Sequence, residues 1–411
     1  MNHTPTESTD DTTGEDLSTP GSFAIRQSDI LEAFGKSKMS IDQFIVDYKV
    51  DNFSGEILSK STDLCIALVV EAFEQMGYSL ASAAAGEKLD RIRYEPQHSR
   101  LVDYLYKFLE KDARLIITKG SQLTRSAVAV PTKPSETLLQ ELLDCHPAWD
   151  YAFKLTHLAG KNLASVLAGK SDGLKVIFGS LEGRRLVTGL YCEHPVNKMC
   201  YNLMKDFLNR LILRLPRGRG PLKILEMGAG TGGTTLVLAP FLASLNMPIE
   251  YTFTDLAPNM VVQARRKFKA YPFMKFAVHD IEKPPAEELL HQHIVIASNA
   301  IHATHNLTKS GENIRKVLRP DGFLMMLEMT AIVPFIDIIF GLLEGWWLFD
   351  DGRTHAIAPA PLWERELQSV GFGHVDWTDG HLPENELQKV IIALASGPAR
   401  KRLPKAGKAA A

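Results

Sequence analysis

The sequence has few cysteines, no closely spaced cysteine pair and no long uninterrupted apolar segment. The four cysteines are Cys65, Cys145, Cys192 and Cys200. Because none of them forms a C-x-x-C motif, we expect neither a disulfide framework nor a zinc site, and we interpret them as buried apolar fillers in a reducing compartment. The closely spaced histidines have no neighbouring cysteine either, so no metal is expected.

No charge of one sign dominates. The chain has 46 Lys and Arg against 48 Asp and Glu, a formal net charge of −2. A dedicated nucleic-acid binder would show a basic excess, so no such partner is expected. The most apolar stretch, residues 332–348, is interrupted by Pro334, Asp337 and Glu344, which argues against a membrane span. The first 21 residues lack the apolar core of a signal peptide, and we predict a cytoplasmic protein.

A length of 411 residues favours two domains. We predict a disordered linker over residues 1–24 and a linker or cloning scar over 398–411, as expected for a domain excised from a larger multidomain protein. Ordinary frayed termini would explain the same composition. From residue 25 to 215 apolar residues recur with a helical period, which predicts a mostly helical lid or substrate domain.

Beyond a Pro- and Gly-rich segment at 216–221, short apolar runs alternate with helical ones. Strands are predicted at 223–227, 250–254, 273–278, 294–298, 322–328, 374–377 and 390–395. Helices are predicted at 234–243, 259–269, 307–318, 333–348 and 361–370. Seven strands with helices between most of them predict an α/β, Rossmann-like, doubly wound sheet over residues 216–397.

The most informative segment is ILEMGAGTGGTT, residues 224–235. Glycines at the end of a strand let a ligand approach the backbone, and the following helix presents free N–H groups. Gly228, Gly230 and Gly233 fit the dinucleotide pattern G-x-G-x-x-G, and Glu226 with Gly228, Gly230 and Gly232 fits E-x-G-x-G-x-G. A carboxylate at Glu226 suits a ligand with an ammonium and a sulfonium better than it suits a pyrophosphate.

Two acidic residues follow the next strands. Asp255 ends the second strand, about 20 residues past the glycines, where a carboxylate can bind both ribose hydroxyls. A helix N-cap is the alternative role. Asp280 follows the third strand and could contact an adenine edge, although a turn-forming role competes with this one.

These motifs stand in the order found in class I S-adenosylmethionine-dependent methyltransferases. The segments SNAIHAT at 298–304 and FGLLEGWW at 340–347 resemble the C-methyltransferase domain of fungal non-reducing polyketide synthases, and the resemblance spans residues 180–397. It implies S-adenosylmethionine as cofactor, S-adenosylhomocysteine as product and Asn299 as a further cofactor-binding residue. It also implies an acceptor held on an acyl carrier protein by phosphopantetheine, within a larger multidomain synthase.

A base can be assigned from strand order. His302 follows the fourth strand and Glu328 ends the fifth, and in sheets of this class these strands are neighbours. We therefore expect His302 to deprotonate a carbon flanked by a ketone and a thioester, with Glu328 orienting the imidazole and methyl transfer to the enolate following in line. His302 could instead cap the next helix, and Glu328 could pair with Arg353.

Other predicted site residues flank this pair. Tyr191 is a further catalytic candidate, which could close over the methyl-donor pocket or donate to the enolate oxygen, or else be a core aromatic. Trp346 and Trp347 are expected in the acceptor wall, although clustered aromatics are more often core. Arg353 could contact a substrate oxygen or a phosphate, or be a solvated turn residue. A basic patch for an acidic carrier protein is expected among Arg184, Arg185 and the run 265–269.

Three functions therefore compete. They are C-methylation of a carrier-bound β-ketoacyl thioester, O-methylation of a free small molecule, and a non-catalytic methyltransferase-like domain of a synthase. A nicotinamide dehydrogenase is a distant fourth, because nothing near the site resembles a proton relay of that class.

Overall fold

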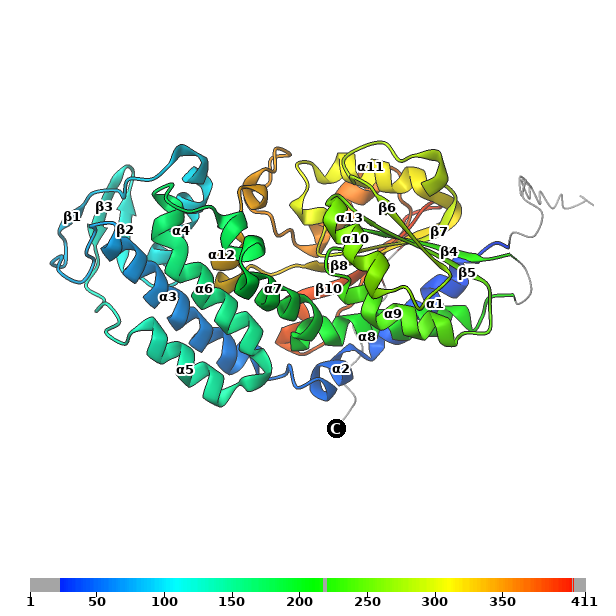
Figure 1. The fold of residues 1–411 in the computed structure, drawn as a ribbon, viewed down its shortest axis with the longest axis horizontal. Helices are drawn as coiled ribbons and strands as arrows, with labels where there is room; N and C mark the ends of the chain where they lie inside the picture. Colours follow the sequence, from blue (N-terminus) through cyan, green and yellow to red (C-terminus); the bar gives the residue numbers. More distant parts are fainter. Residues whose placement is uncertain (1–22, 217–219, 401, 403–411) are drawn as a thin grey trace, which may run out of the picture.

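The computed structural model describes residues 23–216, 220–400 and 402. Most of the two predicted linkers, 1–24 and 398–411, lies outside the described residues. Figure 1 shows two parts side by side, a helical part and a part built around a large twisted sheet. Within the described residues, no helix is long and apolar enough to cross a membrane.

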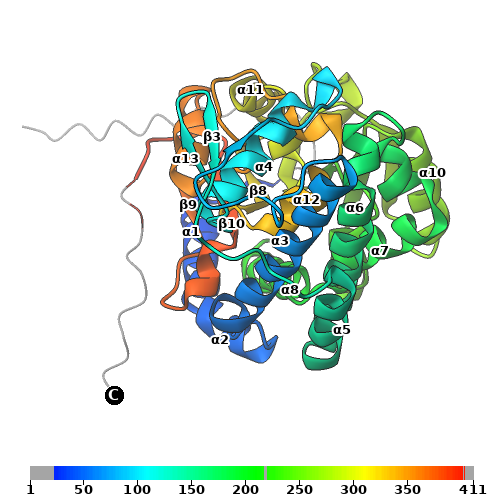
Figure 2. The same ribbon diagram turned by 90° about the vertical axis from the view of Figure 1, so that its left-hand side faces the viewer.

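The first part is mostly helical, as predicted. Its helices are α1 (Gln27–Met39), α2 (Ile41–Asp47), α3 (Leu58–Gln75), α4 (Ser99–Lys111), α5 (Ser135–Cys145), α6 (Asp150–Leu167), α7 (Leu181–Glu193) and α8 (Pro195–Ile212). Helices α3, α5 and α6 run side by side, as seen in Figure 2. α6 approaches α3 closely because Gly160 has no side chain: a Cβ there would lie 2.6 Å from Leu68.

A small antiparallel sheet interrupts the helices and was not predicted. Its strands are β1 (Lys88–Leu89), β2 (Ile116–Lys119) and β3 (Gln122–Arg125), in the order β1-β3-β2. The turn between β2 and β3 contains Gly120 at φ +61°, a conformation that hairpin turns favour. These strands are too short for their period to stand out from the helical pattern around them.

The second part is the predicted doubly wound sheet. Its strands are β4 (Leu222–Met227), β5 (Ile249–Asp255), β6 (Met274–Val278), β7 (Gln292–Ser298), β8 (Leu318–Met329), β9 (Val375–Trp377) and β10 (Gln388–Leu394). Their order is β6-β5-β4-β7-β8-β10-β9, and β10 runs antiparallel to both its neighbours. β4 and β7 are adjacent at the centre, so the carboxyl ends of β4, β5, β7 and β8 meet at one edge.

Helices cover both faces of this sheet. They are α9 (Gly233–Ser244), α10 (Pro258–Lys267), α11 (Leu307–Val317) and α13 (Ala360–Ser369), together with α8 from the first part, whereas α12 (Pro334–Phe340) packs against α3 and α6. Successive residues of β4 belong to different hydrophobic clusters: Ile224 packs in the cluster that contains Phe207 of α8, and Leu225 in the one that contains Trp363 of α13. α8 therefore covers the sheet of the second part and also belongs to the first part. The two parts are called the helical half and the sheet half below.

Candidate active site

The loop between β4 and α9 adopts a backbone that favours glycine. Gly228 and Gly230 have φ values of +61° and +54°. A Cβ on Gly228 would lie 2.5 Å from the Cβ of Ala300, whereas a Cβ on Gly230 would have no neighbour closer than 4.0 Å. Gly228 thus permits close packing under the loop, and Gly230 leaves open space above it.

A cavity of about 560 Å³ lies over this loop, at the carboxyl ends of β4, β5 and β7. Five of the seven predicted cofactor-binding residues line it: Glu226, Gly228, Gly230, Asp255 and Asn299. The catalytic candidate Tyr191 lines it too, from α7. A cavity of this size and position is where doubly wound sheets bind nucleotide-type cofactors.

Asp255 organises the loop. One carboxylate oxygen accepts a hydrogen bond from the N–H of Gly230 at 2.8 Å, and the other accepts one from Ala257, just before α10, also at 2.8 Å. Each carboxylate oxygen has a second lone pair, so the side chain can still bind a diol in the cavity. Asp255 therefore fixes the backbone before α10 and keeps free acceptor capacity at the cavity, and its contact with a ribose stays a prediction.

Glu226 is the buried carboxylate of the site, with an exposed fraction of 1%. Its Oε2 accepts hydrogen bonds from Thr235 at 2.5 Å and from Tyr251 at 2.7 Å. Burial raises the pKa of Glu226 to about 7. A cationic group nearby would lower this pKa again, so the residue is suited to a ligand ammonium. Together with the glycine loop and Asp255, it gives the cavity hydrogen-bond acceptors that fit the ammonium and the ribose hydroxyls of S-adenosylmethionine.

Two predicted cofactor-binding residues are not among those that line the cavity. The Oδ1 of Asp280 accepts a hydrogen bond from the N–H of Glu282 at 2.9 Å, and its carbonyl accepts one from Lys283 at 3.0 Å. This is the turn-forming role, and Asp280 is not among the residues that line the cavity. Gly232 also lies outside the lining, and a Cβ there would lie 2.9 Å from the Phe268 ring, so this glycine serves packing.

Some cavity residues were missed by the sequence reasoning. They include Phe178, Tyr201, Asn259 and Met260. Phe178 and Tyr201 come from the helical half, and no local pattern in the sequence connects that half to the glycine loop.

His302 and Glu328 meet as strand order predicted. His302 lies in a short 3-10 turn, Ile301–Ala303, after β7, and Glu328 lies near the end of β8. The distance from His302 Nδ1 to Glu328 Oε2 is 2.6 Å, and Glu328 Oε1 accepts a hydrogen bond from the N–H of Ile301 at 3.0 Å. Glu328 has an exposed fraction of 0%. Both its oxygens therefore hold the same turn, and they favour the tautomer in which Nδ1 carries the proton and Nε2 is basic.

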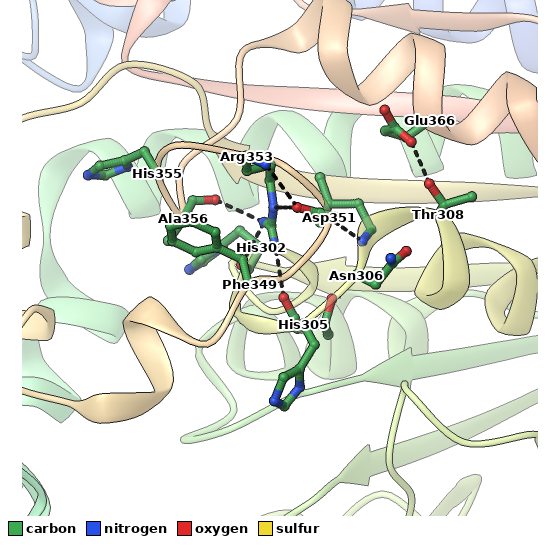
Figure 3. A network of polar contacts seen from close by, with 12 residues as sticks. His302, His305, Asn306, Thr308, Phe349, Asp351, Arg353, His355, Ala356 and Glu366 are labelled. Atoms are coloured by element: carbon green, nitrogen blue, oxygen red, sulfur yellow. Dashed lines mark hydrogen bonds and ion pairs between the residues drawn. The ribbon is translucent and has the colours of Figure 1, made fainter. Parts of the chain in front are cut away.

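Arg353 is neither solvated nor paired with Glu328. Figure 3 shows its guanidinium within the turn that carries His302. It donates to Asp351 at 2.8 Å, to the carbonyl of His302 at 3.1 Å and to the carbonyl of Thr304 at 2.7 Å. Its side chain is buried and does not line the cofactor cavity or the acceptor cavity described next. The structure thus places Arg353 where it fixes the turn that carries His302, whereas the sequence suggested a substrate contact or a surface position.

A second, smaller cavity of about 60 Å³ adjoins the first and is called the acceptor cavity below. His302 lines it together with Trp346, and its wall is otherwise largely apolar. Tyr191 and Asn299 line both cavities, so the two meet at these side chains. Asn299 has φ +50°, an uncommon value for a residue other than glycine, and its side chain accepts a hydrogen bond from the N–H of Met329 at 3.2 Å.

The two predicted wall tryptophans have different places. The helix predicted at 333–348 ends at Phe340, and a 3-10 turn, Glu344–Trp347, follows. This break turns Trp346 towards the site: its ring lies edge-on to His302 with centroids 5.2 Å apart, and its Nε1 donates to Asp337 at 3.0 Å. Trp347 does not line the acceptor cavity, and its Nε1 donates to the carbonyl of Gly341 at 2.9 Å.

The acceptor cavity also contains residues that were not predicted. Phe53, Leu190, His194, Val196 and Asn197 come from the helical half, and Phe335, Phe340, Leu387 and Gln388 from the sheet half. Because they are scattered over more than 300 positions, only the tertiary fold brings them together.

Comparisons with known proteins agree with this geometry. Residues 225–324 match a family described as a methyltransferase domain, and residues 35–123 match one described as a methyltransferase helix-turn-helix domain. The non-reducing polyketide synthase pigA of Monascus ruber is 59% identical over 94% of this chain, and tazA of Aspergillus terreus is 59% identical over 92%. The chain spans only 14% and 15% of the lengths of these two relatives.

Solved structures are similar over nearly the whole chain. The CMeT domain of the citrinin polyketide synthase is 50% identical, with a TM-score of 0.90 over 92% of this chain and 100% of that one. The CurJ carbon methyltransferase is 27% identical, with a TM-score of 0.80 over 91% of this chain and 100% of that one. The chain therefore belongs to the family of C-methyltransferase domains of fungal non-reducing polyketide synthases.

Proposed function

We propose that this chain methylates the α-carbon of a β-ketoacyl thioester, with S-adenosylmethionine as methyl donor. The observation that carries the proposal is the position of the His302–Glu328 pair. The histidine of this pair lines an acceptor cavity that joins the cofactor cavity at Tyr191 and Asn299. A base at the wall of one cavity and a cofactor in the other is the arrangement that a carbon acid needs for deprotonation beside a methyl donor.

The cofactor would be held by Glu226, Asp255 and the open face of Gly230. The chemistry that S-adenosylmethionine supplies when bound is an electrophilic methyl group on a positively charged sulfur. Glu226 would face the ammonium of this ligand and Asp255 its ribose hydroxyls, because these are the buried carboxylate and the carboxylate at the end of β5.

His302 would act as the general base. With its Nδ1 proton held by Glu328, its Nε2 takes the proton from the α-carbon, and the electron pair that is left spreads over the ketone and thioester oxygens. The Glu328 carboxylate stabilises the imidazolium formed. Burial raises the pKa of Tyr191 far above its usual range, so its hydroxyl stays protonated and can donate to an enolate oxygen.

We further propose that the acceptor arrives on an acyl carrier protein. The support is family membership together with basic side chains beside the cofactor cavity. Lys267 donates to the carbonyl of Thr231, which lines that cavity, at 2.9 Å. Lys175 lines it directly, and Arg184 donates to the carbonyl of Gly179, another lining residue, at 2.7 Å. These exposed cations suit an acidic carrier.

The test is mass spectrometry of a β-ketoacyl group, offered on a carrier protein and as a small thioester, after incubation with the chain and S-adenosylmethionine. We expect a gain of one methyl group, located at the α-carbon by fragmentation. Methyl on oxygen would instead show an O-methyltransferase. Absence of any transfer to either acceptor would favour a non-catalytic domain.

A control separates carrier recognition from chemistry. The small thioester should be methylated far more slowly than the carrier-bound thioester of the same acyl group, because it lacks the docking partner but keeps the thioester that acidifies the α-carbon. Equal rates with the two acceptors would contradict the carrier proposal and leave C-methylation standing.

A further inference from the structure

Asp337 is a buried carboxylate that has no part in the chemistry proposed above. It lies in α12 and has an exposed fraction of 0%. It lines neither the cofactor cavity nor the acceptor cavity. A carboxylate in the interior costs free energy unless polar groups bind it, so the groups that it binds call for an explanation.

Asp337 holds two N–H groups with one oxygen. Its Oδ1 accepts a hydrogen bond from Nε1 of Trp346 at 3.0 Å. Nε2 of His355 lies 3.0 Å from the same oxygen. Because Nδ1 of His355 accepts a hydrogen bond from the N–H of Ile357 at 3.0 Å, the ring proton belongs on Nε2, beside Asp337. Trp346 and His355 are thus both tied to a single buried atom.

Aromatic rings enclose this group of residues. Trp346 stacks on Phe340, with centroids 5.6 Å apart, and Tyr104 of α4 has its ring centroid 6.2 Å from that of His355. Burial and the nearby Asp337 carboxylate raise the pKa of Tyr104 far above its usual range, so its hydroxyl stays protonated. His355 also follows Arg353 on the loop that holds the turn with His302, as Figure 3 shows.

Trp346 connects Asp337 to the proposed base. Its ring lies edge-on to the imidazole of His302, with centroids 5.2 Å apart and planes at 77°. Glu328 holds that imidazole at one atom, Nδ1, and a single hydrogen bond leaves the ring free to tilt about it. The indole of Trp346 limits this tilt. Because Trp346 belongs to a 3-10 turn of only four residues, the indole needs a contact beyond its own turn to stay in place.

We propose that Asp337 is a positioning residue for the base: its hydrogen bond fixes the indole of Trp346, and the fixed indole keeps the imidazole of His302 directed at the α-carbon of the acceptor. The inference rests on the proposed role of His302 in deprotonation. Precise support of this kind matters because misplacement of a reacting group by about 1 Å can lower a rate by about 100-fold.

The experiment measures exchange of the α-hydrogens of a small β-ketoacyl thioester for solvent deuterium, without cofactor, at saturating acceptor and after subtraction of the uncatalysed exchange. Rates are expressed per S-adenosylmethionine site counted by calorimetry, so unfolded protein does not contribute. Asp337→Leu removes the acceptor oxygen and should lower the rate per site by about 10- to 100-fold. Asp337→Asn should stay within about threefold of the unmodified chain, because its amide oxygen can take both contacts now made by Oδ1.

Trp346→Phe removes the donor that Asp337 binds and should slow exchange to a similar degree. The double variant, Asp337→Leu with Trp346→Phe, should be little slower than either single variant, since the two residues act as one unit. The matched control is Asp29→Leu. Asp29 is also a buried carboxylate, but it pairs with Arg26 at 2.8 Å and lines neither cavity. This control should leave the rate per site unchanged.

The outcomes separate a positioning role from a merely structural one. A normal rate per site in Asp337→Leu, or in Trp346→Phe if Asp337→Leu does not fold, would overturn the proposal. An equally slow Asp337→Asn would show that the charge is needed rather than the hydrogen bond, and would overturn it too. Full exchange in His302→Ala, or none in the unmodified chain, would overturn the proposed base itself and this inference with it.

Discussion

Replacing Glu328 with glutamine should disable the base without disturbing the cofactor site. Glu328 makes two contacts to one turn: Oε1 accepts from the N–H of Ile301 at 3.0 Å, and Oε2 faces Nδ1 of His302 at 2.6 Å. A glutamine can keep the first contact only by directing its amide oxygen at Ile301. Its NH₂ group then faces Nδ1, which must accept, and the imidazole proton moves to Nε2.

The opposite orientation of the introduced glutamine amide has less favourable hydrogen bonding. It would direct an NH₂ group at the N–H of Ile301, so two donors would face each other in a fully buried place. Glu328→Gln therefore fixes the tautomer that has no lone pair on Nε2. The loss from a wrong tautomer in another histidine–carboxylate enzyme is about 10⁴ in kcat. We expect kcat for methyl transfer to fall by about 10³–10⁴ while the Kd for S-adenosylmethionine changes by less than about twofold, because Glu328 does not line the cofactor cavity.

The assay that isolates this step is exchange of the acceptor α-hydrogen for solvent deuterium without cofactor, followed by mass spectrometry. Glu328→Gln and His302→Ala should both stop it, and the double variant should be little worse than His302→Ala because the pair acts as one unit. Glu384→Gln is a matched control, since Glu384 is another buried carboxylate that accepts from a backbone N–H, that of Ser54, at 2.9 Å. Exchange at near-normal rates in Glu328→Gln would refute the tautomer argument.

Three further results are expected. Gly230→Val should abolish S-adenosylmethionine binding in calorimetry, because the branched side chain would enter the cavity from a backbone at φ +54°; retained binding would place the ligand elsewhere. The affinity for S-adenosylmethionine should rise from about pH 6 to about pH 7.5. Glu226 has a pKa of about 7, and its carboxyl group must lose its proton to attract an ammonium. Glu226→Gln should therefore make the affinity nearly independent of pH over this range. Arg353→Lys should lower kcat by about tenfold or more with unchanged cofactor affinity. A single lysine ammonium cannot reproduce the two hydrogen bonds that the guanidinium donates to the carbonyls of His302 and Thr304. An unchanged kcat would show that these hydrogen bonds are dispensable.

The sequence predicted the sheet and the contact between His302 and Glu328 because both depend on local or topological rules. Each predicted strand overlaps an observed one, since short apolar runs between glycines and helices are typical of doubly wound sheets. His302 and Glu328 are 26 positions apart, yet each follows from the end of its own strand and from the neighbouring positions of β7 and β8. Because β7 and β8 are neighbours, two residues that are each located at the end of their own strand can be predicted to be in contact.

Other features depend on contacts that no local pattern encodes. Arg353 has the sequence context of a surface turn, Asp-Asp-Gly-Arg-Thr, and it is buried only because the turn after β7 offers it carbonyl acceptors. The helix predicted at 333–348 breaks at Gly341, where a Cβ would lie 2.2 Å from the carbonyl oxygen of Asp337. An amphipathic period continues through this break, so periodicity alone could not separate Trp346 from Trp347.

The two halves contribute different parts of the site, so the acceptor cavity can be changed separately from cofactor binding. The groups proposed for proton transfer lie on turns and strands of the sheet half, and most of the cofactor cavity is built there too. The helical half supplies Phe53, Tyr191 and His194 to the acceptor cavity. Substitutions at Phe53 or His194 can therefore alter which acyl chains fit without altering cofactor binding, because neither residue reaches the cofactor cavity. Tyr191 lines both cavities, so a change there should affect the binding of cofactor and acceptor together.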